Sequence, residues 1–413
     1  MDLFFKDSKS NLEVNWDQLL SDLQSAAQYN PYCRETTCYE VFRHLITSLI
    51  LGEKIVLIDF DFCENELIRL IKIPEFTRFV RPIRNHIKQK IKTKQELIQL
   101  IKSPKDSWSI SLFTSGTTGL PKKVTHSYKT ITRSVKISEQ NSTNIWGYCF
   151  DPTHMAGLQV FFQAILNGNP LIRLSGLSNE YIFNEIIGQK ITNISATPTF
   201  YRLLLSSDVV CHSVTHVTSG GEKVDEKTLG KLKMIFPRAK FTNIYASTEA
   251  GSLLASEGTI FAIKPIEEQQ FKIENGELLI HKMLMGDLAT PTDDWYHTGD
   301  LVEIISEDPI KFRFVSRKNE MINVGGNKVN PNEVEDLLRN MPGIKDVHVF
   351  SKVQSILGQV IYCDAVKSDT QIDETNVRLY LQSRLQEFKI PRIIRFVDKI
   401  LTTHTGKIKR SNQ

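Results

Sequence analysis

The chain has 413 residues and a formal net charge of +4, and 41% of its residues are hydrophobic and 24% charged. This is the composition of an ordinary globular protein with room for two or three domains, and the mild charge gives no indication of nucleic-acid binding. No apolar run reaches the roughly 18 residues needed to span a bilayer, which excludes a membrane-spanning helix.

The N-terminus and the cysteines predict a cytoplasmic protein. Residues 1–17 mix acidic residues with lysines and lack a sustained apolar core, so we expect no signal peptide. The six cysteines are scattered, without a CxxC pair. They suit reduced thiols better than a disulfide framework or a zinc site.

The first hundred residues predict a short region of helices and strands. Helical apolar spacing covers residues 15–28 and 35–51, residues 54–60 read as a buried strand, and residues 93–101 form a further short helix. Arg81–Lys94 is the one basic concentration. It fits either a solvated helix face or a docking surface for a phosphate-bearing or acidic partner.

The segment from Ser111 to Val124, SLFTSGTTGLPKKV, has the residues of a phosphate-binding loop. An apolar strand ends at Thr114, and hydroxyl residues, glycines and lysines follow before a helix-like segment that starts at Ser127. Glycines let backbone N–H groups converge on one centre, while hydroxyls and a positive charge add donors. A Walker A loop is excluded because no Gly-Lys-Ser/Thr follows Gly116 at the required spacing, and a Gly/Thr-rich surface turn remains the alternative. The candidate phosphate ligands are Thr114, Ser115, Gly116, Thr117, Thr118, Gly119 and Lys122.

Beyond this loop, strand-like and helix-like segments alternate. The βαβα order predicts a mainly parallel sheet with helices on both faces. Ligands of such sheets bind at the carboxyl ends of the strands, where the loop and the segments after residues 219 and 245 fall. The expected strands are 145–150, 170–174, 192–196, 214–219 and 240–245, and the expected helices are 156–166, 179–187, 198–205 and 223–235.

Three polar segments of this region could carry chemistry. DPTHMAGL (151–158) places His154 at an expected helix start, and the glycines of SGGE (219–222) permit a flat ring to lie against the backbone. YASTEAG (245–251) offers an aromatic face, a hydroxyl and the carboxylate of Glu249, a hard oxygen ligand suited to Mg²⁺. Taken alone, His154 fits a histidine satisfied at a helix start, and Glu249 fits a helix cap.

The last third of the chain predicts a hairpin, a polar turn and a small α+β domain. Asn275-Gly276, within residues 271–281, suits a type I′ turn. Asp300 ends the pentad YHTGD and has two carboxylate oxygens that could accept two ribose hydroxyls. From Met321 onward a small domain of roughly 95 residues is expected. Its elements are a helix over 332–338, strands over 345–351 and 359–366, a helix over 373–385 and an extended tail.

The string TSGTTGLPK (114–122) resembles the phosphate loop of the adenylate-forming superfamily, which comprises acyl-CoA synthetases, adenylation domains and luciferases. SGGE, YASTEAG, YHTGD and the segment 315–338 follow in that superfamily's order, and the resemblance covers about residues 108–410. It implies a mixed α/β fold of mainly parallel sheets layered with helices. A large N-terminal domain, residues 1–317, would be followed by a small α+β lid, residues 318–413. The region before the phosphate loop is shorter than in most relatives.

The resemblance also implies a role for each site residue. The nucleoside would contact Gly220, Gly221, Glu222 and Tyr245 at the adenine and Asp300 at the ribose, and Arg317 would pair with the same ribose hydroxyls or with a phosphate. The reacting groups would contact His154 at the carboxylate pocket, Thr248 at a phosphate, Glu249 through Mg²⁺, and the catalytic Lys407. Gly325 and Gly326 would line the path of a thiol, and Asn319 stands where relatives have an Asp or Lys hinge residue. Without the resemblance, Lys407 would be read as part of a solvated basic tail.

The implied activity is ATP-dependent formation of an acyl-adenylate with release of pyrophosphate, followed by transfer of the acyl group to CoA. The compact length and the H-x-x-G-L pattern look most like small acyl- or aryl-CoA ligases of the o-succinylbenzoate–CoA ligase type. One alternative is a ligase that loads the phosphopantetheine of a carrier protein. Another is a non-catalytic nucleotide sensor, against which the presence of both Glu249 and Lys407 argues. The acid itself is not readable from the residues.

Overall fold

The computed structural model describes residues 2–25, 28–60, 62, 67, 87, 89–114, 122–287, 293–324, 327–354 and 358–400. The chain divides into two compact units. The first unit comprises residues 1–222, 231–257 and 282–294, and the second comprises residues 223–230, 258–281 and 295–413. None of the helices in the described part of the chain combines the length and apolar character that crossing a bilayer requires.

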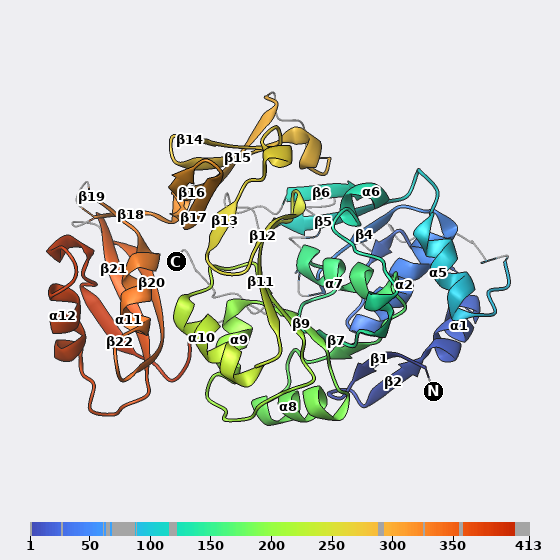
Figure 1. The fold of residues 1–413 in the computed structure, drawn as a ribbon, viewed down its shortest axis with the longest axis horizontal. Coiled ribbons are helices and arrows are strands. Elements are labelled where there is room, and N and C mark those ends of the chain that lie inside the picture. The colour runs from blue at the N-terminus through green and yellow to red at the C-terminus, as the bar shows by residue number, and fades with distance from the viewer. Residues whose placement is uncertain are drawn as a thin grey trace. The chain divides into compact units, whose positions relative to one another are not determined.

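The first unit contains an eight-stranded sheet that is parallel except at its two edges (Figure 1). Five of its inner strands, β7 to β11, are those that the alternating pattern predicts, so the expected mainly parallel sheet is confirmed. In spatial order the strands are β12 (Gly251–Ser256), β11 (Lys240–Ser247), β10 (His216–Gly220), β9 (Asn193–Ala196), β7 (Trp146–Tyr148), β8 (Leu171–Arg173), β1 (Leu3–Asp7) and β2 (Leu12–Asn15). The N-terminal strand β1 joins this sheet through parallel pairing of Phe5 with Leu171 of β8. No local sequence pattern predicts this pairing.

A second sheet of the first unit carries the predicted phosphate loop. Its strands are β3 (Tyr32–Cys33), β4 (Ile55–Leu57), β5 (Ser109–Thr114) and β6 (Lys122–Ser127). Strand β6 returns antiparallel to β5, with Thr114 opposite Lys122. The segment that leads to Ser127 is therefore a strand, and the helix expected there is only the short α6 (Tyr128–Ile131).

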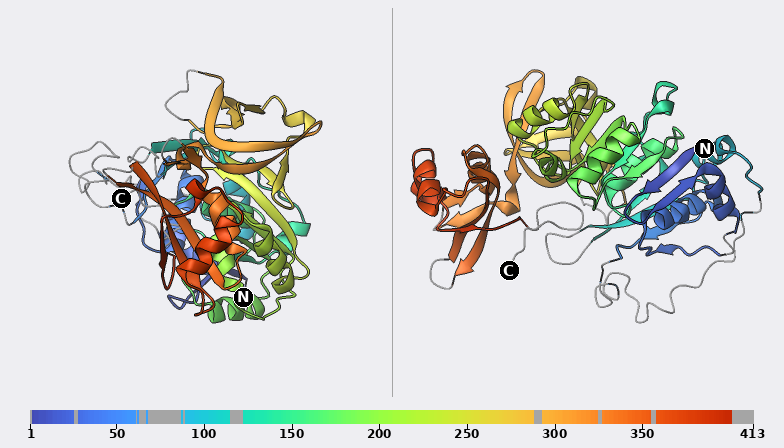
Figure 2. Two further views of the ribbon diagram at one scale, coloured as in Figure 1. Left: turned by 90° about the vertical axis from the view of Figure 1, so that its left-hand side faces the viewer. Right: turned by 90° about the horizontal axis from the view of Figure 1, so that it is seen from below.

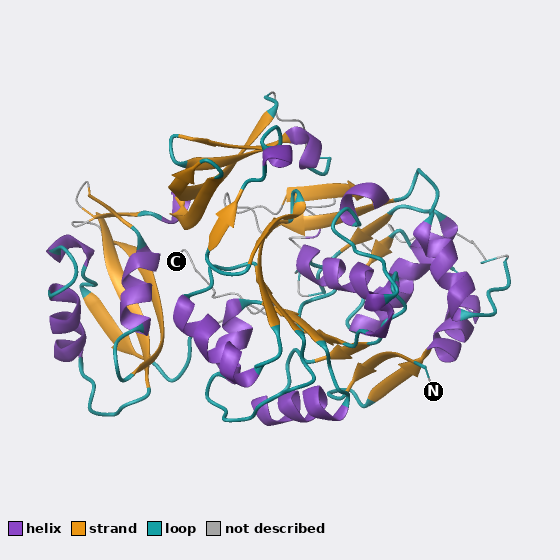
Figure 3. Ribbon diagram, in the orientation of Figure 1, coloured by secondary structure: helices purple, strands orange, loops and turns teal. Residues whose placement is uncertain are grey.

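Helices α2 and α7 fill the core of this unit, and α8 and α9 lie on the other face of the eight-stranded sheet (Figure 3). Phe42 of α2 stacks on Phe161 of α7 at 4.7 Å between ring centroids and meets the edge of Tyr148 from β7 at 5.3 Å. The unit's helices are α1 (Trp16–Ser25), α2 (Cys38–Leu51), α5 (Lys94–Lys102), α6, α7 (Met155–Ile165), α8 (Asn179–Gly188) and α9 (Pro198–Leu204). Helix α10 (Glu226–Ile235) belongs partly to each unit.

An antiparallel five-stranded sheet forms one part of the second unit. Its strands are β13 (Ile260–Ala262), β17 (Ile310–Arg317), β16 (Trp295–Glu307), β15 (Glu277–His281) and β14 (Phe271–Glu274). The hairpin predicted over residues 271–281 is confirmed as β14 and β15. Asn275 and Gly276 both have positive φ, 51° and 74°, as a type I′ turn requires.

The C-terminal part of the second unit has its own apolar core under a three-stranded sheet (Figures 1 and 2). The expected extended tail contains a strand, β22, which pairs parallel with β21. The elements are β18 (Ile322–Val324), β19 (Asn327–Val329), α11 (Pro331–Arg339), β20 (Ile344–Gln354), β21 (Gly358–Lys367), α12 (Glu374–Gln382) and β22 (Ile393–Phe396). The α+β character expected here is confirmed, while the domain boundary after residue 317 stays a prediction.

A buried ion pair lies within α11, between Glu335 and Arg339, and Glu335 also bonds α11 to β20 in this core. The Glu335 side chain is 2% exposed; it accepts a hydrogen bond from Arg339 Nη2 at 3.0 Å and one from the Val349 N–H at 2.8 Å. His348 Nδ1 lies 3.2 Å from the other end of the same carboxylate. Removal of one partner would leave the other charge buried, which is far more costly than the loss of an exposed pair.

We therefore expect Arg339→Met to lower the free energy of unfolding by about 3–5 kcal/mol. The matched control is Arg313→Met, which removes the exposed pair of Arg313 with Glu303 on the five-stranded sheet and should cost about 1 kcal/mol or less. Urea unfolding followed by circular dichroism measures both. Equal costs for the two variants would show that the buried pair contributes nothing beyond a surface pair.

Candidate active site

The predicted phosphate loop lies between two paired strand ends. Thr114 and Lys122 are opposite one another where β5 and β6 begin to separate, and Lys122 is exposed. Residues 115–121, which include five of the candidate ligands, fall outside the described residues. The hairpin thus fixes where this loop starts and ends.

The SGGE turn and the Thr248–Glu249 turn emerge side by side. Strands β10 and β11 are parallel neighbours, with Gly220 opposite Ile244. A side chain at Gly220 would meet the Ile244 carbonyl oxygen at 3.2 Å, and Gly221 has a φ of 82°, so both positions suit glycine. The expectation that the segments after residues 219 and 245 meet at the carboxyl edge of one sheet is confirmed. The phosphate loop was expected at the same edge, and this is wrong, because its strand β5 belongs to the separate four-stranded sheet.

Glu222 is directed to helix α9. Its carboxylate accepts hydrogen bonds from the backbone N–H and the hydroxyl of Thr199, at 3.1 and 2.6 Å, and lies 3.7 Å from Arg202. Thr199 stands in the first turn of α9, where N–H groups lack helical partners. The carboxylate of Glu222 therefore anchors the turn, and the adenine-lining role expected of this segment stays a prediction.

The backbone that carries Thr248 and Glu249 is held through its carbonyl groups. His126 Nε2 lies 2.8 Å from the Thr248 oxygen, and the Gly286 N–H donates to the Glu249 oxygen at 2.7 Å. Burial lowers the pKa of His126, so the neutral ring donates through Nε2–H. The sequence motifs did not indicate His126 or Gly286, because neither belongs to them.

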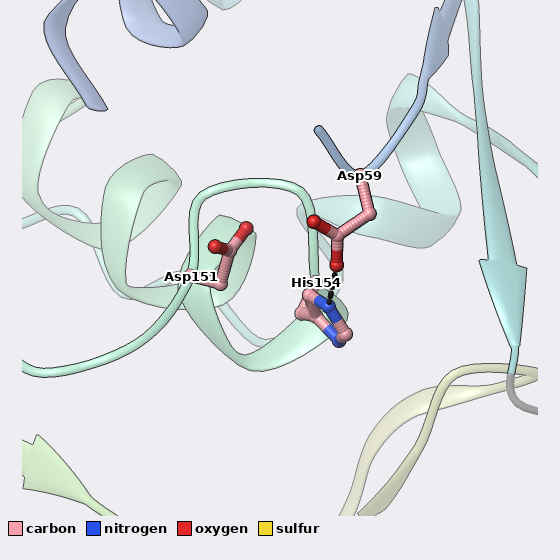
Figure 4. A group of neighbouring side chains, drawn as sticks. All are labelled: Asp59, Asp151 and His154. Atoms are coloured by element: carbon pink, nitrogen blue, oxygen red, sulfur yellow. Dashed lines mark hydrogen bonds and ion pairs between the residues drawn. The ribbon is translucent and has the colours of Figure 1, made fainter. Parts of the chain in front are cut away.

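His154 caps the start of α7 and forms a pair with Asp59, which follows β4 (Figure 4). The distance between His154 Nε2 and Asp59 Oδ2 is 3.0 Å, and Asp59 is buried. Asp151 lies nearby and accepts hydrogen bonds from the N–H and hydroxyl of Thr153. Ligand atoms of Asp59, Asp151 and His154 lie within 4.8 Å of one another, so these side chains could accept a cation. Sequence reasoning missed Asp59, since it is far from the motif that contains His154.

In the second unit, Asp300 and Arg317 are direct partners across β16 and β17. Arg317 Nε donates to Asp300 Oδ1 at 2.8 Å, and Asp300 is buried while Arg317 is exposed. Sequence reasoning assigned both residues to the ribose. The structure brings them together, although they are 17 positions apart.

Glu277 supports the turn that leads to Asp300. Its carboxylate accepts a hydrogen bond from the Gly299 N–H at 2.9 Å and lies 3.4 Å from His297 Nδ1 and 3.5 Å from Lys318 Nζ. Burial alone would raise the pKa of Glu277, but the N–H of Gly299 and the two neighbouring bases lower it below its usual value. A buried carboxylate thus connects the YHTGD turn to the residue after Arg317.

Several predicted site residues fall outside the described residues: Ser115, Gly116, Thr117, Thr118, Gly119, Gly325, Gly326 and Lys407. The same holds for the side chains of Thr114 and Asn319 and for half of the basic stretch 81–94. Their roles remain predictions.

Comparisons with known proteins agree with the motifs. The model of the AMP-binding enzyme family matches residues 43–276, and that of the AMP-binding enzyme C-terminal domain matches residues 333–407. A 2-succinylbenzoate–CoA ligase of Listeria monocytogenes is 27% identical over 339 residues, which are 74% of this chain and 70% of the relative.

Solved structures share the fold. An o-succinylbenzoate CoA synthetase of Bacillus subtilis, in complex with an acyl-adenylate intermediate, is 17% identical and has a TM-score of 0.68 over 99% of this chain and 94% of that one. The same synthetase with ATP and a magnesium ion is 18% identical and has a TM-score of 0.70, with 99% and 96% covered.

The lowered pKa of Glu277 makes its contribution to stability depend on pH. A carboxylate whose pKa is lowered by folding stabilises the protein above its unfolded pKa of about 4.5, and this stabilisation is lost as the pH falls through the folded value. We expect Glu277→Gln to cost about 1 kcal/mol at pH 7, since the amide can still accept from Gly299 but loses the charge. The cost should shrink as the pH is lowered below about 4.5.

Urea unfolding at several pH values measures this difference, with Glu274→Gln, an exposed residue of the same hairpin, as the control. A cost of Glu277→Gln that does not change with pH would contradict an ionic role for this carboxylate.

Proposed function

The chain belongs to the AMP-binding enzyme family, and from this premise we propose that it is an acid–thiol ligase. It activates a carboxylic acid with ATP as an acyl-adenylate, releases pyrophosphate, and transfers the acyl group to the thiol of CoA. The observation that carries the proposal is the register of β10 and β11, which presents the SGGE turn and the Thr248–Glu249 turn at one sheet edge. The listeria relative's activity on 2-succinylbenzoate makes aryl acids of this kind the first substrates to test.

The first half-reaction needs positioning and charge stabilisation. The carboxylate attacks the α-phosphate of ATP, its oxygen forms the new P–O bond, and pyrophosphate leaves with the electrons of the broken bond. Negative charge builds on phosphoryl oxygens, so donors fixed in advance lower the barrier. Thr248 and the loop 114–122 supply such donors, and Lys407 bridges the carboxylate and the α-phosphate.

The residues fit a magnesium ion at Glu249. This carboxylate is a hard oxygen donor on a turn whose backbone is held by His126 and Gly286, and it is half-buried. When bound, Mg²⁺ supplies positive charge to the phosphates of ATP. Glu249 holds the ion, while the Asp300–Arg317 pair orients the ribose.

The acid binds beside His154. The hydrogen bond to buried Asp59 fixes the plane of the imidazole, so that the ring presents one edge to the carboxylate pocket.

The second half-reaction needs a path for the thiol. The thiol sulfur attacks the acyl carbon, the C–S bond forms, and AMP leaves with the electrons of the broken C–O bond. The lid, residues 318–413, serves both steps with different residues: Lys407 for the adenylate and Gly325–Gly326 for the thiol. The phosphopantetheine of a carrier protein presents the same thiol as CoA, so an assay with both acceptors distinguishes these partners.

A cytosolic location fits the thiols: Cys33, Cys38, Cys149, Cys211 and Cys363 are free.

Pyrophosphate release with ATP, Mg²⁺ and a panel of carboxylic acids tests the function as a whole. We expect at least one acid to cause release of pyrophosphate, and we expect a thioester to form when CoA is added. Nucleotide binding without release for any acid would favour a nucleotide sensor.

Asp300→Ala should weaken the binding of ATP by about 1.5–3 kcal/mol, the range for hydrogen bonds to a charged group. Isothermal titration calorimetry with Mg·ATP measures the change. The control is Glu303→Ala, an exposed carboxylate farther along β16 that should leave the affinity unaltered. An unchanged affinity in Asp300→Ala would remove this residue from the nucleotide site.

Two variants should separate the half-reactions. Lys407→Ala should slow acyl-adenylate formation by a factor on the order of 10²–10³, as for the loss of one fixed electrostatic donor, and spare thiol transfer from prepared acyl-adenylate. Gly326→Leu should do the reverse, because a branched side chain would block the thiol. Single-turnover assays of each step measure this, and equal damage to both steps in both variants would contradict the proposed division of roles.

A further inference from the structure

The turn Thr248–Ala250 is anchored at three successive carbonyl groups by residues outside it. The Thr248 oxygen accepts from His126 Nε2 at 2.8 Å, and the Glu249 oxygen accepts from the Gly286 N–H at 2.7 Å. The Ala250 oxygen accepts from Arg133 Nη2 at 2.6 Å. None of these bonds uses the side chain of Thr248 or Glu249, so within the described residues the turn is anchored without its own side chains.

His126 connects this turn to the strand that leaves the phosphate loop. The histidine is 1% exposed and lies on β6, four residues beyond Lys122, whereas Thr248 is 122 positions away in the chain. A carbonyl oxygen can only accept, so Nε2 carries the proton in this bond. One buried side chain therefore sets the distance between two segments that the proposed function assigns to the phosphates.

Gly286 packs against the His126 ring and against strand β6. A Cβ atom at Gly286 would lie 2.7 Å from His126 Cε1 and 2.7 Å from the Thr125 oxygen, so only glycine lets this backbone pass the ring. The next residue, Asp287, exchanges backbone hydrogen bonds with Thr125, at 2.7 and 3.3 Å. Strand β6, residues 286–287 and the Thr248–Glu249 turn are thus joined around the imidazole.

We propose that His126 is a positioning residue of the nucleotide site, which holds Thr248 and Glu249 at the place where they meet the phosphates and the magnesium ion of ATP. The inference rests on the proposed function. Its physical basis is that side chains committed to a ligand cannot also fix their own backbone, and small displacements of positioning groups are costly to catalysis. His126 does not touch the substrate; it acts through the Thr248 carbonyl.

Four variants test this through the affinity for Mg·ATP and the melting temperature. His126→Leu removes the donor and should weaken the affinity about tenfold, the upper range for one neutral hydrogen bond. His126→Gln places an amide N–H where Nε2 stood and should recover the affinity to within about threefold. Gly286→Ala keeps the histidine but displaces its ring, and should resemble His126→Leu.

Ser111→Ala is the matched control. It removes a half-buried hydrogen bond of the same hairpin, between the hydroxyls of Ser111 and Thr125 at 2.9 Å, without touching the Thr248 turn. It should lower the melting temperature and leave the affinity unchanged. Calorimetry measures the affinity for Mg·ATP without relying on turnover. It is carried out below the lowest melting temperature of the variants and repeated over a range of Mg²⁺ concentrations.

The outcomes separate the two proposals. Wild-type protein that does not bind Mg·ATP would overturn the proposed function together with this inference. Wild-type binding that persists unaltered in His126→Leu and Gly286→Ala would overturn the inference alone. So would a Gln variant as weak as the Leu variant, or a Ser111→Ala variant with the same loss of affinity. If His126→Leu does not fold, the comparison of Gly286→Ala and His126→Gln with wild type decides.

Discussion

Turns at the ends of buried strands must have their backbone groups satisfied by residues outside the turn, and the candidate site depends on this constraint. A buried carbonyl or N–H without a partner is costly, and the side chains of a binding turn are committed elsewhere. Among the described residues, buried or half-buried polar side chains satisfy backbone groups at two such turns, and a third turn is anchored by its own side chain. His126 bonds the Thr248 carbonyl, Glu222 bonds Thr199 at the start of α9, and Glu277 bonds the Gly299 N–H. Each of these bonds makes a turn rigid before any ligand arrives, which is what electrostatic preorganisation requires.

The secondary structure that sequence reasoning captured is the part set by local pattern. The alternating strands and helices from residue 145 to 245 and the Asn275-Gly276 hairpin are confirmed. They could be predicted because the periodicity of buried residues, and the residue types that adopt positive φ, can be recognised in a short stretch of sequence. Strands β1, β6 and β22 were missed for a different reason. Strand β1 owes its place to pairing with β8, more than 160 positions away, and β6 begins with two exposed lysines that read as a loop. Pairing of this kind follows from tertiary context, which no short window of sequence contains.

The same division applies to the candidate site. The residues expected to meet the nucleotide could be named because glycines, hydroxyls and carboxylates recur in fixed strings. The residues that hold them could not, since Asp59, His126 and Glu277 lie in segments with no motif of their own. Glu222 shows the limit of motif reasoning in the other direction. It lies inside a recognised string, yet its carboxylate is bonded to Thr199, so a place in a motif indicates the turn without indicating what each side chain does.

A comparison of two ion pairs of the second unit shows how a core and a proposed binding site can use the same chemistry differently. Glu335 and Arg339 are both almost fully buried, so either charge alone would be strongly unfavourable and the pair is committed to the fold. Asp300 is also buried, but the side chain of its partner Arg317 is 47% exposed. A pair with one solvated member contributes little to stability, on the order of 1 kcal/mol or less. In the ribose site that we propose, hydrogen bonds from ribose hydroxyls to Asp300 would therefore replace part of this interaction at little cost to the fold.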